Sequence, residues 1–322
     1  MPIYKTGLPD GTEDFVGNDA IIIENLREKL LNRFHKKGFG LVIPSLIEFS
    51  EKLGGGSNQE LKEAAFSFSD NITGKDISVR PDISQQIARI DIAQGAKGEK
   101  RYCYFGETLR KAGDSLTKSK VNFKSGVEFF GKINSASEKE ILSLMIESLK
   151  LTGLKKITIS LGRTEPMNDL IDKMSLETTQ ESTLKKIMST KSETDLIEFC
   201  KKLSVKKNNL NDLLLLVSAS GSQEVLKKLK SHKNSIFQSS SKKIENLIKV
   251  LPKGVNYHVD FSDFPGYDYH EGLVFSGHVE NYGSAISNGG SYKTIYGKGS
   301  SREAIGFDLS VSAVLKALEK ES

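Results

Sequence analysis

The stretch Asp260-Phe-Ser-Asp-Phe-Pro-Gly-Tyr-Asp-Tyr-His-Glu-Gly-Leu-Val-Phe-Ser-Gly-His-Val279 has the pattern of a strand, a loop and a second strand. Apolar and polar residues alternate over 255–261 and again over 273–279, which predicts two half-buried strands. Pro265-Gly266 lies between them and predicts a turn. The turn brings one carboxylate, two phenols and one imidazole to the strand ends, on Tyr267, Asp268, Tyr269 and His270.

These loop side chains have two interpretations. Convergent polar groups on a short loop fit a pocket for a small ligand. Alternatively, the aromatic rings pack against the core and Asp268 caps a turn. The stretch alone does not decide between them.

The composition of the 322 residues excludes several classes of protein. The chain is long enough for one large domain or two ordinary ones with a substantial core. No apolar run is long enough to span a bilayer, and Met1–Gly7 has no signal-peptide core. The net charge of +5 comes from lysines scattered among acids, which is typical of a solvated surface. We therefore expect no membrane and no nucleic-acid partner.

The chain has two cysteines, Cys103 and Cys200, and they lack the spacing of metal ligands. We expect them to be reduced thiols of a cytoplasmic protein. No metal and no cofactor is expected.

The N-terminal part predicts a helix followed by an interrupted strand. Residues 18–38 have an apolar stripe at helical spacing and end at Gly38, a typical helix stop. Residues 39–49 have the pattern of a strand that Pro44 interrupts. Because a proline cannot donate a hydrogen bond to a neighbouring strand, this strand is expected at a sheet edge or with a bulge.

Residues 77–84 predict a short strand that ends at Arg80-Pro81, where a helix is expected to begin. Asp82 is a suitable cap for that helix. The functional alternative is that Asp82 and Ser84 point into a pocket and bind an ammonium group. The local pattern fits both.

Residues 101–110 and 122–131 predict a β-hairpin with a long basic loop. Strand periodicity places Lys124, Gly126 and Glu128 on one face. A lysine and a glutamate with a glycine between them leave a floor on which a ligand can lie. The alternative is an ordinary ion pair on a solvated sheet, which stabilises the fold little.

The remaining chain predicts helices and further strands. Residues 137–140 form a capping-box motif that is expected to open a helix. Residues 285–292 predict a strand that runs into a turn at Gly289-Gly290. Leucine and lysine dominate residues 164–252, which we expect to be a helical insertion between two sheet-forming parts. Its helical spacings fall at 167–176, 193–203, 209–217, 223–230 and 242–250.

Taken in order, these stretches resemble the catalytic core of class II aminoacyl-tRNA synthetases, specifically histidyl-tRNA synthetase. The matching segments are Leu8–Phe15, Gly38–Glu48, Arg80–Ser84, Gly106–Gly131, Gly266–Tyr269 and Gly289–Tyr292. The resemblance implies an α+β fold with a mainly antiparallel sheet flanked by helices. It implies one core domain over residues 1–322, interrupted by the helical insertion at 164–252 and without an anticodon-binding domain.

The departures from the synthetase pattern concern ATP chemistry. Pro265 stands where the family has a catalytic arginine. Ala313 stands where its third motif has the arginine that binds the nucleotide phosphates. Arg110 is kept, but Ala112 replaces the acid that reads adenine. Losing one fixed cation at a developing phosphate charge costs about a hundredfold in rate or more. A working synthetase is therefore not expected.

The amino-acid pocket of the family is better matched. The resemblance implies that Asp82 and Ser84 hold the ammonium of histidine, and that Glu128 and tyrosines surround the imidazole. Lys124 replaces a glutamine and is expected to supply the cation for the carboxylate. The candidate histidine-binding residues are Asp82, Ser84, Arg110, Lys124, Glu128, Asp268, Tyr269, His270 and Tyr292.

This combination is similar to a second family, the regulatory subunits of ATP phosphoribosyltransferase, whose loop resembles Tyr269-His-Glu-Gly272. The resemblance implies a non-catalytic protein that activates a short catalytic subunit in the first step of histidine biosynthesis. It also implies histidine feedback and a hetero-octamer built on dimers that pair through the first-motif strand. Two alternatives stay open: a short synthetase paralogue that makes an adenylate for a non-tRNA acceptor, and a scaffold with a vestigial pocket.

Overall fold

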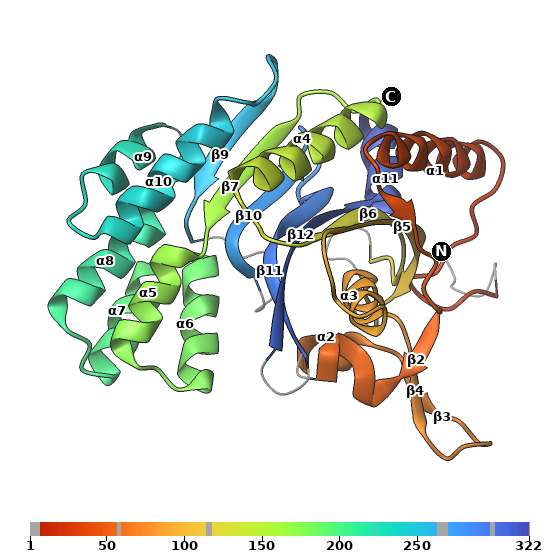
Figure 1. The fold of residues 1–322 in the computed structure, drawn as a ribbon, viewed down its shortest axis with the longest axis horizontal. Coiled ribbons are helices and arrows are strands. Elements are labelled where there is room, and N and C mark those ends of the chain that lie inside the picture. The colour runs from red at the N-terminus through yellow and green to blue at the C-terminus, as the bar shows by residue number, and fades with distance from the viewer. Residues whose placement is uncertain are drawn as a thin grey trace.

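A computed structural model describes residues 7–56, 59–113, 118–221, 223–262, 270–296 and 300–321. Within these ranges, a sheet of nine strands runs through the molecule in the order β1-β5-β6-β12-β11-β10-β7-β9-β8 (Figure 1). Pairing is antiparallel except between β1 and β5 and between β7 and β9. In chain order these strands are β1 Gly40–Leu41, β5 Lys100–Leu109, β6 Val121–Phe130, β7 Thr158–Arg163, β8 Ser220–Gly221, β9 Asn256–Asp260, β10 His270–His278, β11 Ser287–Tyr296 and β12 Ser300–Ser310. The expected α+β fold with a mainly antiparallel sheet is confirmed.

Three helices cover one face of this sheet: α1 (Asn18–Lys36), α4 (Ser135–Leu151) and α11 (Val311–Glu321) (Figure 1). Their apolar stripes meet the alternate strand residues that point to this face, and together they form the large core. Phe34 of α1 and Phe307 of β12 meet edge to face at 6.0 Å between ring centroids.

The other face is covered by α3 (Ser84–Ala93), a 3₁₀ helix (Ser50–Gly56), α2 (Gln59–Ala64) and a second sheet. That small sheet has the order β2-β4-β3, from Ile47–Phe49, Asp76–Val79 and Ser67–Ser69. A small buried cluster joins α3 to the large sheet: Ile83, Ile87, Ala88, Tyr102, Tyr104, Phe130, Tyr292 and Ala304. Two hydroxyls of this cluster have polar partners beside it: Tyr104 Oη lies 3.3 Å from Ser84 Oγ, and Tyr292 donates to Glu128.

The single strand predicted over 39–49 is wrong. The segment forms two short strands in different sheets, because Pro44 between them has no N–H to continue a ladder. The Pro44 carbonyl instead accepts a hydrogen bond of 2.9 Å from Arg80 Nη1. The expected edge position is confirmed for β1, which ends the nine-stranded sheet.

Two other local predictions need correction. Gly289-Gly290 does not form a turn but lies within β11, where both residues pair with β10 and β12. Glycine fits at position 289 because a Cβ there would lie 2.5 Å from the Phe275 ring. The helix expected to open at residues 137–140 begins at Ser135. Its capping box joins Asn134, the N-cap, to Ser137 at the third helical position.

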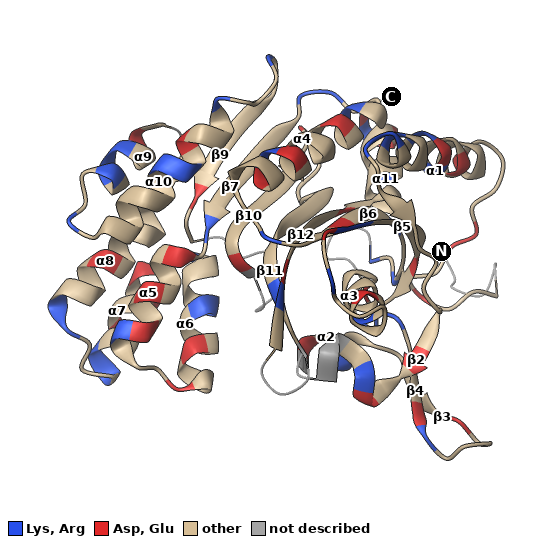
Figure 2. Ribbon diagram, viewed as in Figure 1, with Lys and Arg blue, Asp and Glu red and all other residues tan. Residues whose placement is uncertain are grey.

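The described part of residues 165–248 contains six helices, which form the left part of Figure 1. The helix α6 was not predicted, and neither was β8, which pairs with β9 at the sheet edge. The helices are α5 Glu165–Met174, α6 Thr178–Thr190, α7 Glu193–Lys202, α8 Lys207–Ser218, α9 Gln223–Lys230 and α10 Ser235–Ile248. Figure 2 shows charges of both signs spread along them, as expected of a solvated surface.

The two strands of the opening stretch, β9 and β10, do not pair with each other. Both pair with β7, which lies between them. The loop 263–269 that joins them lies outside the described residues. None of the described helices is long and apolar enough to cross a membrane.

Candidate functional site

The site lies on the α3 face, where β5, β6 and β12 run side by side. Tyr104 and Asp308 both lie opposite Gly126 of β6. Two residues on, Glu128 lies opposite Gly306. Directly opposed residues of paired strands share a face, so the predicted common face of Lys124, Gly126 and Glu128 is confirmed.

Two glycines make room for the polar side chains of this face. A Cβ on Gly306 would lie 2.2 Å from Glu128 Oε2, and a Cβ on Gly126 would lie 2.6 Å from Tyr104 Oη. Any larger residue at either position would displace these groups. The glycines are therefore the floor of the site.

Glu128 is the most deeply buried acid of the site, with 1% of its surface exposed. Its Oε2 accepts a hydrogen bond of 2.8 Å from the hydroxyl of Tyr292. Burial raises the pKa of Glu128 to about 8, although hydrogen bonds from Ser84 and Tyr292 act in the opposite direction. A carboxyl in this state can exchange a proton with a bound ligand near neutral pH.

Asp82 lies close to Glu128 and is also buried. Burial raises the pKa of Asp82, the Lys124 ammonium lowers it, and Asp308 raises it again. Asp82 Oδ1 also accepts from the backbone N–H of Gln85 at 3.4 Å, near the start of α3. The N-cap of α3 is Ile83 and has no side-chain cap hydrogen bond, so Asp82 does not occupy the predicted cap position. It still contacts the first turn of the helix through Gln85 and lies beside Glu128.

Lys124 forms an ion pair with Asp308, with 2.8 Å between Nζ and Oδ1. Asp308 and Tyr104 are site residues that the sequence did not identify. A signal for Asp308 exists in β12, where Ala304, Gly306 and Asp308 alternate with large apolar residues. That alternation places the small and polar set on the site face.

Arg110 follows the first hairpin strand and lies close enough to Asp82 for its charge to lower the pKa of that carboxyl. Arg110 Nη2 is 3.6 Å from Glu60 Oε1. Arg110 lines a separate cavity of about 640 Å³, together with Lys111, Lys124 and Ala313. Lys124 therefore stands between this cavity and the buried acids.

The remaining candidates belong to the loop before β10. Asp268 and Tyr269 lie outside the described residues. The backbone of His270 begins β10 and pairs with Tyr292 of β11. The strand register thus brings the end of the loop to the strand that carries the Glu128 partner.

Possible metal ligands and the two cysteines are the remaining reactive side chains in the part of the chain that the structure describes. No group of three or more His, Cys, Asp or Glu residues there is arranged to hold a metal ion. Cys103 and Cys200 are both buried. Burial raises the pKa of Cys103 to about 12, so its thiol is inert at neutral pH.

The comparisons with known proteins agree with this architecture. A family model described as histidyl-tRNA synthetase matches residues 11–314. A solved structure from Bacillus halodurans, titled ATP phosphoribosyltransferase regulatory subunit/histidyl-tRNA synthetase, superposes with a TM-score of 0.83 at 20% identity. The match covers 98% of this chain and 83% of that one. The fold is thus that of the class II synthetases of the histidyl type.

A curated relative from Marinomonas sp., named ATP phosphoribosyltransferase regulatory subunit, is 32% identical over 323 residues. That alignment covers 96% of this chain and 81% of the relative. The chain belongs to the family of ATP phosphoribosyltransferase regulatory subunits. The same fold occurs in the ATP phosphoribosyl transferase (HisG:HisZ) complex from Thermotoga maritima, with a TM-score of 0.67, 16% identity, and coverage of 92% of this chain and 98% of that one.

Proposed function

We propose that this chain is a non-catalytic regulatory subunit that binds free histidine and adjusts the activity of a separate catalytic subunit in the cytoplasm. The observation that carries the proposal is the group formed by the buried Glu128, Tyr292 and Asp82 and the half-buried Ser84. Burying two carboxyls costs free energy unless they have partners or a ligand. A pocket that retains this arrangement is suited to a ligand with an ammonium and a second N–H donor.

Histidine offers these groups in one molecule. Asp82 and Ser84 would hold its ammonium, and Glu128 would accept from the imidazole N–H. Lys124 would bind the carboxylate, because its side chain also lines the cavity of about 640 Å³ beside Arg110. Asp308 already holds Lys124, so the ligand carboxylate has to share or replace that ion pair.

The cavity beside Arg110 supports the proposal that the chain does not activate amino acids with ATP. Ala313 lines its wall at the position where the resemblance places an arginine for the nucleotide phosphates. A methyl group cannot stabilise the charge that develops on phosphate during amino-acid activation. Binding of an amino acid without its activation is the expected result.

Regulation requires a partner. The relatives are named as regulatory subunits, and the Thermotoga maritima structure is titled as a complex of two components. We propose a short catalytic subunit as the partner, in a hetero-octamer. If histidine binds more tightly to the conformation that holds the partner inactive, substrates of the partner must weaken histidine binding by the same factor.

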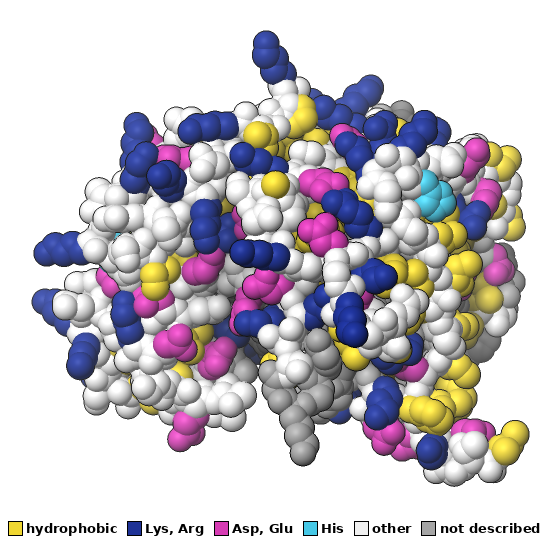
Figure 3. All heavy atoms as spheres, viewed as in Figure 1, with side chains coloured by type: hydrophobic (Ala, Val, Ile, Leu, Met, Phe, Trp, Pro, Cys, Tyr) yellow, Lys and Arg dark blue, Asp and Glu magenta, His cyan; other side chains and the backbone are white. Residues whose placement is uncertain are grey.

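The octamer would be built on dimers of this chain. Exposed apolar side chains gather on β1, β2 and the segment between them: Leu41, Ile43, Leu46, Ile47 and Phe49. Apolar side chains also gather at the lower right of Figure 3, over the small sheet of Figure 1. An exposed apolar patch of this kind is typical of a protein–protein interface. This patch lies on the first-motif segment, which supports self-pairing there.

Calorimetry with histidine tests the site. The wild-type chain is expected to bind histidine saturably, and Glu128→Ala and Lys124→Ala are each expected to weaken binding by about tenfold or more. Glu28→Gln, at an exposed position of α1, is the matched control. Unchanged affinity in both site variants would refute the assignment. Co-purification with a short catalytic subunit, assayed with and without histidine, tests the regulatory role.

The cavity beside Arg110 and Lys111 favours a second candidate, activation of an amino acid with ATP for a non-tRNA acceptor. Its volume of about 640 Å³ is large enough for a nucleotide-sized ligand. Exchange of labelled pyrophosphate into ATP in the presence of histidine decides between the candidates. Exchange above background would replace the regulatory proposal by an enzymatic one.

A further inference from the structure

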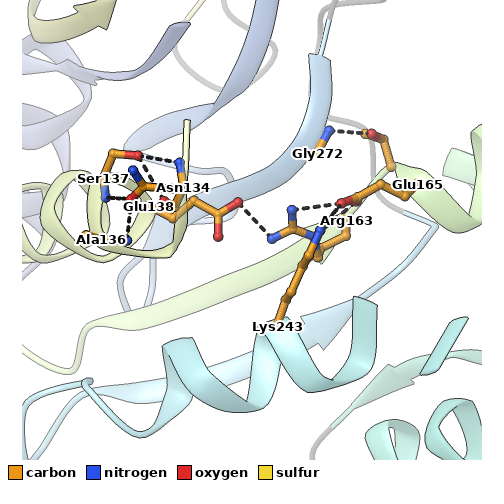
Figure 4. A network of polar contacts seen from close by, with 9 residues as sticks. Asn134, Ala136, Ser137, Glu138, Arg163, Glu165, Lys243 and Gly272 are labelled. Atoms are coloured by element: carbon orange, nitrogen blue, oxygen red, sulfur yellow. Dashed lines mark hydrogen bonds and ion pairs between the residues drawn. The ribbon is translucent and has the colours of Figure 1, made fainter. Parts of the chain in front are cut away.

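A second cavity of about 560 Å³ lies where the α5–α10 helices meet the nine-stranded sheet. Its walls come from the start of α4, the end of β7, α5, α10, β10 and β11. Figure 4 shows part of its polar lining, with Arg163 of β7 between Glu138 of α4 and Glu165 of α5. The proposed histidine site does not include any of these three side chains.

The two cations of this second cavity are already paired within it. Arg163 is 3% exposed and lies 2.9 Å from Glu138 Oε1 and 2.8 Å from Glu165 Oε1. Lys243 of α10 lies 3.2 Å from the same oxygen of Glu165. Neither cation is available to an anionic ligand without breaking these ion pairs.

Carboxylates remain after this pairing. Besides Glu138 and Glu165, the cavity is lined by Asp169, Asp172, Glu271 and Glu303. Lys173 pairs with Asp169, and Lys293 lies 3.7 Å from Glu271, and neither lysine lines the cavity. Glu303 accepts from the backbone N–H of Ile133 with one oxygen. The cavity therefore keeps a surplus of negative charge, which favours a cationic ligand.

An independent observation also points to a ligand. Ser291 of β11 lines the cavity and is 5% exposed, and its hydroxyl has no hydrogen-bond partner within the described ranges. A Cβ on Gly272 would meet Ser291 Oγ at 3.8 Å and Arg163 Nη2 at 3.5 Å, so hydroxyl and guanidinium lie on the same side of Gly272. A buried hydroxyl left without a partner is uncommon, and one that lines a cavity is available to a ligand there.

The spacing of the carboxylates around the cavity indicates which kind of cation it can bind. No three acidic side chains in the described chain converge as metal ligands, so a divalent ion is a poor fit. The carboxylates are instead distributed around a cavity many times larger than an ion. We propose that this second cavity binds a small aliphatic polyamine, with separated ammonium groups on different carboxylates and one of them hydrogen-bonded to Ser291.

The position of the second cavity connects it to the histidine site. Ser291 and Tyr292 are neighbours on β11, and successive strand residues point to opposite faces of a sheet. Both residues line the second cavity. The hydroxyl of Tyr292 reaches Glu128 on the α3 face, whereas Ser291 lies with Arg163 on the α4 side. A polyamine on Ser291 would thus bind directly behind the residue that holds Glu128.

Calorimetry on the full chain tests the polyamine proposal with 1,4-diaminobutane and spermidine as probes. Butylamine, with a single ammonium, and magnesium chloride are the ligand controls. Ser291→Ala is expected to weaken diamine binding by about tenfold, the typical effect of losing a hydrogen bond to a charged group. Asp172→Asn is expected to weaken it as well, whereas Asp14→Asn at an exposed site near the chain start should not.

Ser240→Ala is the matched control for Ser291→Ala. Ser240 of α10 has a buried hydroxyl that is likewise without a partner in the described chain, but it does not line the second cavity. Both alanine variants should fold, because each removes an unsatisfied buried polar atom. Saturable diamine binding that is reduced only in Ser291→Ala supports the proposal. No saturable binding, equal binding in both serine variants, or equal competition by magnesium would overturn it.

Discussion

Tyr292 and Glu128 are joined by a hydrogen bond of 2.8 Å although they are 164 positions apart in the chain. The bond runs from β11 to β6 and crosses above β12, which lies between these strands. The crossing is possible because Gly306 of β12 leaves the space that a side chain would fill. The buried carboxyl of the site is therefore positioned by three strands.

Tyr292→Phe should destabilise the fold although it removes only the phenol oxygen. The substitution leaves Glu128 buried without its phenol partner, which typically costs about 1–3 kcal/mol. It should also raise the pKa of Glu128 further, because the bond from Tyr292 lowers it. Urea unfolding measures the free energy, with Tyr257→Phe on β9 as the control. Equal stability of the two variants would argue against the hydrogen bond.

The raised pKa of Glu128 predicts that the chain loses stability toward alkaline pH. An unfolded glutamate titrates near 4.5, whereas Glu128 in the folded chain titrates at about 8. Between these values the folded chain keeps a proton that the unfolded chain has released, so stability falls as the pH rises. The contribution of Glu128 is complete below the lower value and lost above the higher one. Asp82, whose pKa burial also raises, adds to the slope in the same direction.

Glu128→Gln should flatten this pH dependence, because an amide does not titrate in that range. The measurement is the free energy of unfolding in urea at about pH 6 and about pH 8.5, where the state of Glu128 differs. The wild-type chain should lose stability between the two, and the variant should lose clearly less. A variant with the wild-type slope would mean that Glu128 does not cause it.

Gly306→Ala should destabilise the site, because the added methyl group has no space between β6 and the Glu128 side chain. The new Cβ would lie 2.2 Å from Glu128 Oε2 and 2.4 Å from the backbone oxygen of Val127. Overpacking of this kind costs about 1–3 kcal/mol and sometimes more. Gly40→Ala is the control, because its nearest atom is 3.8 Å away. Thermal unfolding that shows the same midpoint for both variants would contradict the clash.

The parts of the site that lie on one hairpin could be predicted from sequence. Lys124, Gly126 and Glu128 follow strand periodicity, and the structure places them on one face. Local patterns also give α1, the hairpin strands and most of the α5–α10 helices, because each pattern depends on neighbours in the chain.

The parts of the site that depend on pairing between distant segments could not be predicted from the sequence. Asp308 meets Lys124 across two strands that are 184 positions apart, and periodicity does not give strand order. The second cavity needs α4, α5, α10 and β11 to be brought together, which no local pattern encodes. The strand prediction around Pro44 failed for a related reason. The sequence shows that strand pairing stops at the proline, but it does not show that the next strand joins another sheet.

Asp308→Asn gives the sharpest test of how Lys124 is used. Asp308 pairs with Lys124 at 2.8 Å, so a ligand carboxylate has to compete with it. Removing the negative charge should free the ammonium of Lys124 and tighten histidine binding by a few-fold. Asp308 also raises the pKa values of Asp82 and Glu128, so the variant should lower both and favour their ionised forms. Lys124→Ala should act in the opposite direction on affinity. Calorimetry with histidine on both variants decides the matter, and weaker binding by Asp308→Asn would show that Asp308 contacts the ligand itself instead of competing with it.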